Sequence, residues 1–255
     1  MFGFLELGRK LSPSWLSPEP PSEQDHLSAA RRKAELRQIF RDSREKLKQR
    51  AHLHKDPWGA AHIQQLSGFL YQQGVCSNPG LLSLRTGEIA AYWPIGSELE
   101  LLPELQQSSR MKPDPSTARW WLPITRPDKQ MGWFQICDEI NAWPKDKLGL
   151  PVPPEAVFKC LFSAQPESPW LVLTPCLAAD RNGTRLGYGG GFYDRFLQQH
   201  GRDCLSVACV PEALFLEKDA IPADKHDVAV DIVVTENQVW IRDEKTAKDK
   251  LKRFT

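Results

Sequence analysis

A cluster of glycines between an apolar run and an expected helix is the feature that most constrains how this chain folds. The stretch Arg185–Arg195 reads Arg-Leu-Gly-Tyr-Gly-Gly-Gly-Phe-Tyr-Asp-Arg; it follows the apolar run Leu171–Thr174 and leads into an expected helix over Phe192–Gln199. Glycine tolerates positive φ and lets the backbone approach a ligand closely. The start of a helix offers free N–H groups and the positive end of the helix dipole. The pattern therefore favours a nucleotide or phosphorylated ligand, with the two arginines adding charge and Asp194 able to hold a metal ion on the phosphate.

The glycines alone fit a second interpretation equally well. Glycine-rich turns between a strand and a helix are often only tight turns, with no ligand. The chain has no GxxxxGK[ST] phosphate loop, and the spacing of its glycines does not match the dinucleotide fingerprint. The neighbouring residues therefore decide more than the glycines do.

These neighbouring residues are more specific. The stretch Thr174–Arg195 resembles the signature of the 5-formyltetrahydrofolate cyclo-ligase family, also called 5,10-methenyltetrahydrofolate synthetases. Lys33–Arg37 is similar to the N-terminal Lys/Arg pair of the family, and Tyr92–Leu99 is similar to its Y-x-P…E segment. Ile221–Glu236 is similar to its C-terminal P-x-x-x-HD…D…TE segment. The segments occur in the family order, and the resemblance covers roughly residues 28–240.

The expected elements indicate an α/β fold. Helices are predicted over 27–49 and 58–73, besides the one after the glycines. Strands are predicted over 87–94, 120–123, 171–174, 205–210, 228–235 and 239–242, with prolines ending the first two. Strands that alternate with helices favour a sheet covered by helices. The resemblance implies a three-layer α/β/α sandwich with a mostly parallel central sheet.

The chain divides into three expected parts. Residues 1–26 include a stretch rich in proline and serine and are predicted to form a flexible leader. Residues 27–245 are predicted to form the cyclo-ligase-like catalytic domain, and residues 246–255 a charged C-terminal tail.

Composition narrows the class of protein. A chain of 255 residues that is 41% hydrophobic can bury a sizeable core. The net charge of +1 gives no overall attraction to nucleic acid or to a membrane surface, and no apolar run reaches the length of a membrane span. The six cysteines form no CxxC pair, which favours reduced thiols in the cytoplasm. We expect a monomer that acts on small molecules.

The resemblance implies a reaction and its cofactors. The reaction is the ATP-dependent conversion of 5-formyltetrahydrofolate to 5,10-methenyltetrahydrofolate, with release of ADP and phosphate. An N-formyl group is a poor electrophile, so the formyl oxygen is phosphorylated before N10 attacks the carbon and closes the ring. Such chemistry needs positioning, charge stabilisation and a metal ion on the phosphates. The implied cofactor is Mg²⁺, with ATP as co-substrate.

The resemblance also implies roles for individual residues. The residues implied to bind ATP are Lys33, Arg37, Arg185, Leu186, Gly187, Tyr188, Gly189, Gly190, Gly191, Phe192 and Tyr193. The residues implied to act in catalysis are Arg185 and Tyr193, those implied to bind the folate are Glu98, Tyr188 and Phe192, and those implied to hold the metal are Asp194 and Asp231. Taken without the resemblance, Asp194 also fits a helix-start residue paired with Arg195, and Asp231 a loop cap.

Three positions depart from the family pattern. Ala179 replaces a phenylalanine, Val152 replaces a glutamate, and Trp170 stands where an aspartate is usual. These departures leave open a family member with an altered substrate. Two other hypotheses are a non-catalytic nucleotide-binding relative and a module that binds RNA or an acidic partner through the basic segment 31–55.

Overall fold

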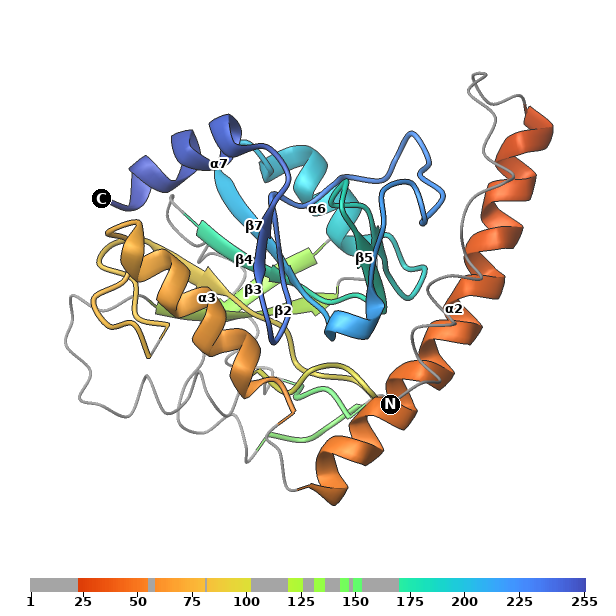
Figure 1. The fold of residues 1–255 in the computed structure, drawn as a ribbon, viewed down its shortest axis with the longest axis horizontal. Coiled ribbons are helices and arrows are strands. Elements are labelled where there is room, and N and C mark those ends of the chain that lie inside the picture. The colour runs from red at the N-terminus through yellow and green to blue at the C-terminus, as the bar shows by residue number, and fades with distance from the viewer. Residues whose placement is uncertain are drawn as a thin grey trace.

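A seven-stranded sheet, with five neighbouring parallel strands, forms the centre of the fold (Figure 1). The structure is a computed structural model that describes residues 23–54, 58–80, 82–101, 119–125, 131–135, 143–146, 149–152 and 170–255. The strand order is β10-β9-β7-β4-β1-β2-β3, and the two edge strands are antiparallel to their neighbours. The strands are β1 Glu88–Ala90, β2 Arg119–Thr125, β3 Met131–Gln135, β4 Trp170–Thr174, β7 Cys204–Cys209, β9 Ile232–Val234 and β10 Val239–Ile241.

Helices cover both faces of this sheet because successive side chains of a strand point to opposite sides. Leu171 and Leu173 of β4 face the helices α3 (Ala60–Gln72) and α7 (Glu244–Leu251) in one buried cluster. Trp170 and Val172 of the same strand belong to a second cluster with Phe196 and Leu197 of α6 (Phe192–His200). The predicted three-layer α/β/α arrangement with a mostly parallel sheet is therefore confirmed.

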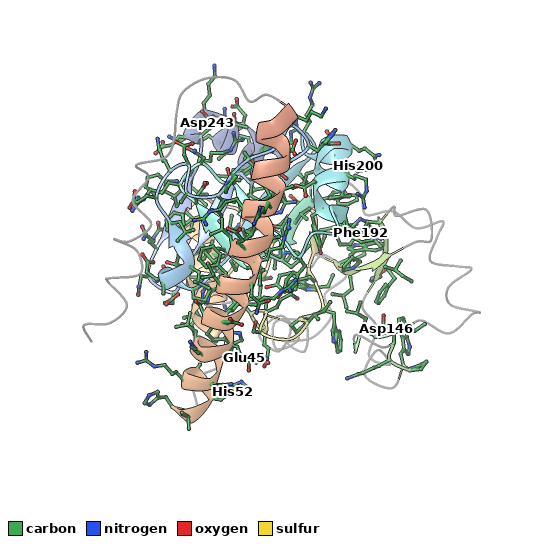
Figure 2. The ribbon with its side chains drawn as sticks, turned by 90° about the vertical axis from the view of Figure 1, so that its right-hand side faces the viewer. Glu45, His52, Asp146, Phe192, His200 and Asp243 are labelled. Atoms are coloured by element: carbon green, nitrogen blue, oxygen red, sulfur yellow. The ribbon has the colours of Figure 1, made fainter. Side chains whose placement is uncertain are left out.

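The long helix α2 (Glu23–Leu53) packs against a second, smaller sheet. This sheet has the order β6-β5-β8, formed by β6 Arg185–Leu186, β5 Ala178–Asp180 and β8 Phe215–Leu216, with the 3₁₀ helix η2 Glu212–Leu214 next to it. Leu36 and Phe40 of α2 contact Leu186 and Leu214 in a buried cluster. Figure 1 shows α2 along one side of the molecule, beside β5. Figure 2 shows α2 crossing the front, with Phe192 and His200 of α6 to one side.

The N-terminal boundary differs from the prediction. The helix expected over 27–49 spans Glu23–Leu53, so the last residues of the expected leader are helical. Residues 1–22 lie outside the described part of the chain. Among the described helices, none combines the length and the apolar character that crossing a membrane requires.

The C-terminal boundary is a clearer correction. Residues 246–255, expected to form a charged tail, belong to α7 and the 3₁₀ helix η3 (Lys252–Phe254). Ala247, Leu251 and Phe254 are buried, because their spacing of four and three residues places them on one helical face. The segment looks like a charged tail when only its composition is considered, because charged residues stand between these three apolar positions.

One strand also continues past its predicted end. We expected Pro123 to end the second strand, but β2 runs on to Thr125, and Pro123 pairs with Trp133 of β3. The remaining expected strands are present with shorter or shifted bounds.

We predict that Phe254→Ala lowers the free energy of unfolding by about 3–5 kcal/mol, because truncating a buried phenylalanine leaves a cavity. Phe254 is 1% exposed and packs in the cluster beneath α3. Urea denaturation measures the effect, and Lys252→Ala is the control, since Lys252 is exposed and its ion pair with Asp249 lies in solvent. Equal midpoints for the two variants would contradict the packing of this segment.

Candidate functional site

The glycine loop, residues 187–191, joins β6 to the start of α6. Gly189 has φ of 102° and Gly191, the N-cap of α6, has φ of 64°. Both values lie in the left-handed region that favours glycine. No side chain caps α6, so the N–H groups of its first turn are not used by a cap. The loop therefore has the geometry of an anion site at a helix start, as predicted.

Two arginines of α2 lie next to this loop. The Nε of Arg37 donates a hydrogen bond to the carbonyl oxygen of Gly187 over 3.0 Å, and the guanidinium of Arg41 lies 5.6 Å from the centre of the Tyr188 ring. Burial first, and then the charge of Arg41, lowers the pKa of Arg37. Positive charge is thus concentrated over the glycines by residues one helical turn apart.

A second group of polar contacts forms around Val228. Arg185 is paired with Oδ1 of Asp194 over 3.0 Å and donates to the carbonyl oxygen of Val228 over 2.6 Å, while the N–H of Val228 donates to Asp194 over 3.2 Å. The neighbouring Asp227 forms an ion pair with Lys33 through Oδ2. Asp194 therefore contacts the backbone of the residue that follows Asp227, and Lys33 contacts the carboxylate of Asp227.

Asp194 and Asp227 are a second candidate pair of carboxylates beside the expected pair, Asp194 and Asp231. Among the described residues, the contacts given for Asp194 engage Oδ1 and those for Asp227 engage Oδ2, which leaves the second oxygen of each for a cation. No group of three or more histidines, cysteines, aspartates and glutamates within the described segments is arranged to hold a metal. Mg²⁺ commonly takes one or two carboxylates and completes its shell with water and phosphate oxygens.

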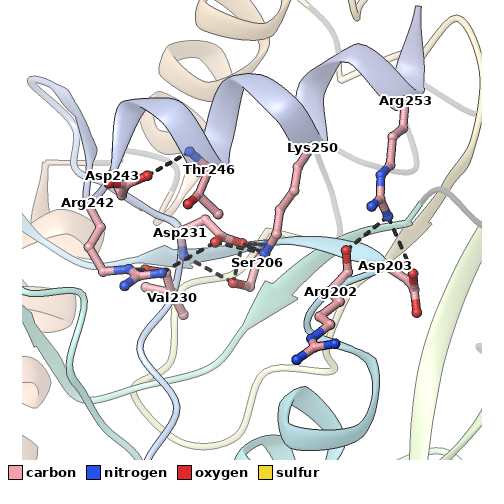
Figure 3. Close-up of polar contacts among 10 residues, drawn as sticks. All are labelled: Arg202, Asp203, Ser206, Val230, Asp231, Arg242, Asp243, Thr246, Lys250 and Arg253. Atoms are coloured by element: carbon pink, nitrogen blue, oxygen red, sulfur yellow. Dashed lines mark hydrogen bonds and ion pairs between the residues drawn. The ribbon is translucent and has the colours of Figure 1, made fainter.

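Asp231, the second carboxylate of the predicted metal site, makes several polar contacts of its own (Figure 3). Its buried carboxylate lies just before β9 and accepts hydrogen bonds from the backbone N–H and the hydroxyl of Ser206, at 2.9 and 2.8 Å. The ammonium of Lys250 lies 2.9 and 2.7 Å from its two oxygens, and Arg242 lies at 3.8 Å. Both of its oxygens are engaged, and these contacts join β7, β9 and α7. The metal role of Asp231 stays a prediction.

Glu98 lies in a buried place next to the glycine loop. It follows β1, is 3% exposed, and accepts a hydrogen bond from the N–H of Ile95 over 2.7 Å. Burial raises the pKa of Glu98 to about 7. Burial, and then the nearby charge of Glu98, raises the pKa of Tyr188 and of Tyr193. These shifts indicate that the carboxylate and both phenols border a common region.

The hydroxyl of Tyr193 is a notable polar group in this region. It is buried, and it has no hydrogen-bond partner among the residues that the structure describes. After burial and Glu98, the charge of Arg185 also acts on the pKa of Tyr193, in the lowering direction. The charges of Glu98 and Arg185 thus both act on this phenol, and a ligand next to it could accept its proton in a hydrogen bond.

Two predicted loop residues have more local contacts. The side chain of Leu186 is 1% exposed and packs with Leu36 and Phe40, so only its backbone is available to a ligand at the loop. The ring of Phe192 lies 5.0 Å from the guanidinium of Arg195, which also donates to the carbonyl oxygen of Gly190 over 3.0 Å. Arg195 therefore stabilises the loop through the carbonyl oxygen of Gly190 and the ring of Phe192.

Sequence reasoning did not separate Arg44 from the other charged residues of the basic segment 31–55. Arg44 is fully buried and donates to the carbonyl oxygens of Ser97, Cys176 and Leu177, at 2.9, 2.5 and 3.1 Å. The available signal was its spacing. Lys33, Arg37, Arg41 and Arg44 recur every three or four residues and thus share one face of α2.

Comparison with known proteins gives a consistent result. Residues 85–236 match the model of the 5-formyltetrahydrofolate cyclo-ligase family. The 5-formyltetrahydrofolate cyclo-ligase of Mycolicibacterium smegmatis is 34% identical over 160 residues, which cover 58% of this chain and 72% of that protein. The enzyme of the same name from Escherichia coli K12 is 40% identical over 72 residues, or 28% of this chain and 38% of that protein.

Two solved structures share the fold. The 5,10-methenyltetrahydrofolate synthetase of Aquifex aeolicus has a TM-score of 0.54 at 22% identity, covering 83% of this chain and 93% of that chain. The synthetase of Mycoplasma pneumoniae has a TM-score of 0.52 at 19% identity, covering 80% and 98%.

We predict that Glu98→Gln stabilises the protein above pH 7 by about 3 kcal/mol, because the folded state disfavours the ionised carboxylate. The raised pKa, about 7 against 4.5, makes this cost complete above pH 7 and absent below pH 4.5. The advantage of the variant should therefore shrink as pH falls through that window. Urea denaturation at several pH values measures it, with the more exposed Glu100→Gln as control. A difference in the free energy of unfolding that does not change with pH would contradict the raised pKa of Glu98.

Proposed function

The chain belongs to the 5-formyltetrahydrofolate cyclo-ligase family, and from that membership we propose that it converts 5-formyltetrahydrofolate to 5,10-methenyltetrahydrofolate with hydrolysis of ATP to ADP and phosphate. The observation that supports this most directly is that two sites of different chemistry lie next to each other. A cationic glycine loop suited to phosphates adjoins a buried carboxylate suited to N–H donors, and the buried hydroxyl of Tyr193 is influenced by the charge of that carboxylate.

The glycine loop is proposed to hold the triphosphate of ATP. Phosphate oxygens accept hydrogen bonds from backbone N–H groups at a helix start, and here the first turn of α6 has no side-chain cap. Arg37 and Arg41 add positive charge from α2. Lys33 and Arg185, each paired with an aspartate, border the same loop and are proposed to meet the terminal phosphates.

Asp194 and Asp227 are proposed to hold Mg²⁺. When bound, Mg²⁺ would supply positive charge that offsets the negative charge developing on the phosphate oxygens. The support is the convergence of both aspartates on the segment at Val228 and their second oxygens. Asp231 is left out of this site because Lys250 and Ser206 occupy its carboxylate.

Glu98 is proposed to bind the pterin ring. A carboxylate accepts two hydrogen bonds from adjacent N–H donors, which a pterin edge provides. Because burial disfavours the ionised form of Glu98 in the free protein, a ligand with two donors stabilises that form and is bound preferentially. Tyr188 and Phe192 are proposed to flank the formyl group where the two sites meet.

The proposed reaction has two bond-exchange steps. The formyl oxygen attacks the γ-phosphorus, and the bond from that phosphorus to ADP breaks. N10 then attacks the activated carbon, the carbon–oxygen bond to phosphate breaks, and N10 loses its proton. The protein positions both reactants and stabilises the transferred charge. Arg185 is proposed to stabilise that charge, and the Tyr193 hydroxyl to donate a hydrogen bond to the reacting oxygen.

The contacts of α2 weigh against the interaction-module hypothesis. Lys33, Arg37, Arg44 and Lys48 each contact another part of this chain, so much of the basic segment serves the fold and the site.

The cysteines at 76, 176, 204 and 209 are free thiols, which supports the proposed cytoplasmic location. We propose that the protein acts as a monomer on small molecules.

We predict that the purified protein with 5-formyltetrahydrofolate and Mg²⁺ produces the near-ultraviolet absorbance band of the methenyl product only when ATP is added. The rise should be matched by release of one phosphate for each product formed, because phosphate leaves as the ring closes. A flat absorbance trace from folded protein that binds ATP would contradict the proposed reaction and favour a changed substrate or a non-catalytic relative.

We predict that Asp194→Asn and Asp227→Asn each raise the Mg²⁺ concentration needed for half-maximal turnover at least tenfold, since each removes a charged ligand. Asp231→Asn is the matched control: it should lower the melting temperature while leaving the Mg²⁺ requirement within about twofold, because its carboxylate serves the fold. Titration of Mg²⁺ at saturating ATP checks both. The reverse pattern would restore Asp231 to the metal site.

A further inference from the structure

Arg44 is a buried cation whose bonds are unusual. It is 0% exposed, and within the described part of the chain its hydrogen bonds go to three carbonyl oxygens and to no carboxylate. Moving an ionised group out of water is costly unless other interactions offset the loss. Carbonyl dipoles satisfy the N–H groups but leave the positive charge unneutralised. A buried arginine whose charge is not neutralised therefore points to a function for that charge near the residues that Arg44 contacts.

The three carbonyls identify those surroundings. Ser97 precedes Glu98 in the loop after β1, and Cys176 and Leu177 lie in the segment after β4. One guanidinium therefore ties α2 to the loops at the carboxyl ends of two adjacent parallel strands. The indole N–H of Trp58 donates to the carbonyl oxygen of Glu98 over 2.9 Å and secures the same loop from the other side.

We propose that Arg44 is a positioning residue that orients Glu98 for the pterin ring and favours its ionised form. This inference rests on the proposed function, in which Glu98 binds the folate. Arg44 acts through Glu98 in two ways: its bond to Ser97 fixes the backbone next to the carboxylate, and its positive charge offsets part of the cost of burying a negative one.

The charged and titratable groups around Glu98 support this role. The charge of Glu98 contributes to raising the pKa of four surrounding groups: Tyr92 on the same loop, Cys176 after β4, Tyr188 on the glycine loop and Tyr193 on α6. All four are neutral near pH 7, since burial raises the pKa of each. Arg44 lowers the pKa of Glu98, after the opposing effect of burial and the bond from Ile95. Arg44 is thus the positively charged residue among these groups around Glu98.

The test compares Arg44→Met, Arg44→Lys and the control Lys46→Met, an exposed residue of the same helix. We expect Arg44→Met to raise the KM for 5-formyltetrahydrofolate about tenfold, because a charged hydrogen-bonding group is lost, and to leave the KM for ATP within about twofold. The pH at which folate affinity rises, near 7 in the wild type, should move upward. Arg44→Lys should keep the wild-type midpoint because it keeps the charge, and Lys46→Met should change nothing.

A double-variant cycle with Glu98→Gln separates this role from a general loss of structure. If Arg44 acts through Glu98, Arg44→Met should have little further effect on folate affinity in the Glu98→Gln background. Equal losses in both backgrounds, an equal rise in the KM for ATP, or an unmoved pH midpoint in Arg44→Lys and Arg44→Met alike would overturn the proposal. An inactive wild-type protein would instead count against the proposed function. Direct folate binding by fluorescence quenching then tests Arg44 on its own.

Discussion

The packing of α2 against the small sheet is the interaction on which the site depends. Leu36 and Phe40 enter a buried cluster with Leu186 and Leu214, and the helical repeat fixes where every other residue of α2 points. Once these two side chains are docked, Arg37 and Arg41 lie at the glycine loop and Arg44 lies at the segment after β4. One apolar contact therefore sets the position of several cations that repel one another and would not gather unaided.

The parallel sheet supplies the second half of the site. Parallel strands place their carboxyl ends at one edge, where ligands bind in open α/β sheets. The loop after β1 brings Glu98 to this edge, and the segment after β4 leads through β5 and β6 to the glycines. Residues distant in sequence thus meet because two neighbouring strands run in the same direction.

Local patterns predicted the features whose chemistry is local. The glycine loop, its helix and the apolar strands were predictable, because positive φ, a helix start and a fully buried strand each leave a signature within a few residues. The contacts of Asp231 and Arg44 could not be predicted, for the opposite reason. Whether a carboxylate meets Lys250 or a metal, and whether an arginine meets water or three carbonyls, depends on residues elsewhere in the chain. Asp227 was passed over likewise, since its nearness to Asp194 arises only through Val228.

The way Arg44 and Glu98 are arranged explains why two buried charges of opposite sign do not pair directly. A direct ion pair would lower the electrostatic cost of both, but it would also occupy the carboxylate oxygens that a pterin edge needs. Arg44 instead binds the carbonyl oxygen of Ser97, one residue away, and acts on Glu98 through the low-dielectric interior. Among the described contacts, the carboxylate of Glu98 accepts a hydrogen bond from the N–H of Ile95 and no cation touches it. The protein thus keeps a carboxylate that is held in place, partly offset in charge and still open to a ligand, and the instability of that carboxylate in the free state becomes affinity when two N–H donors arrive.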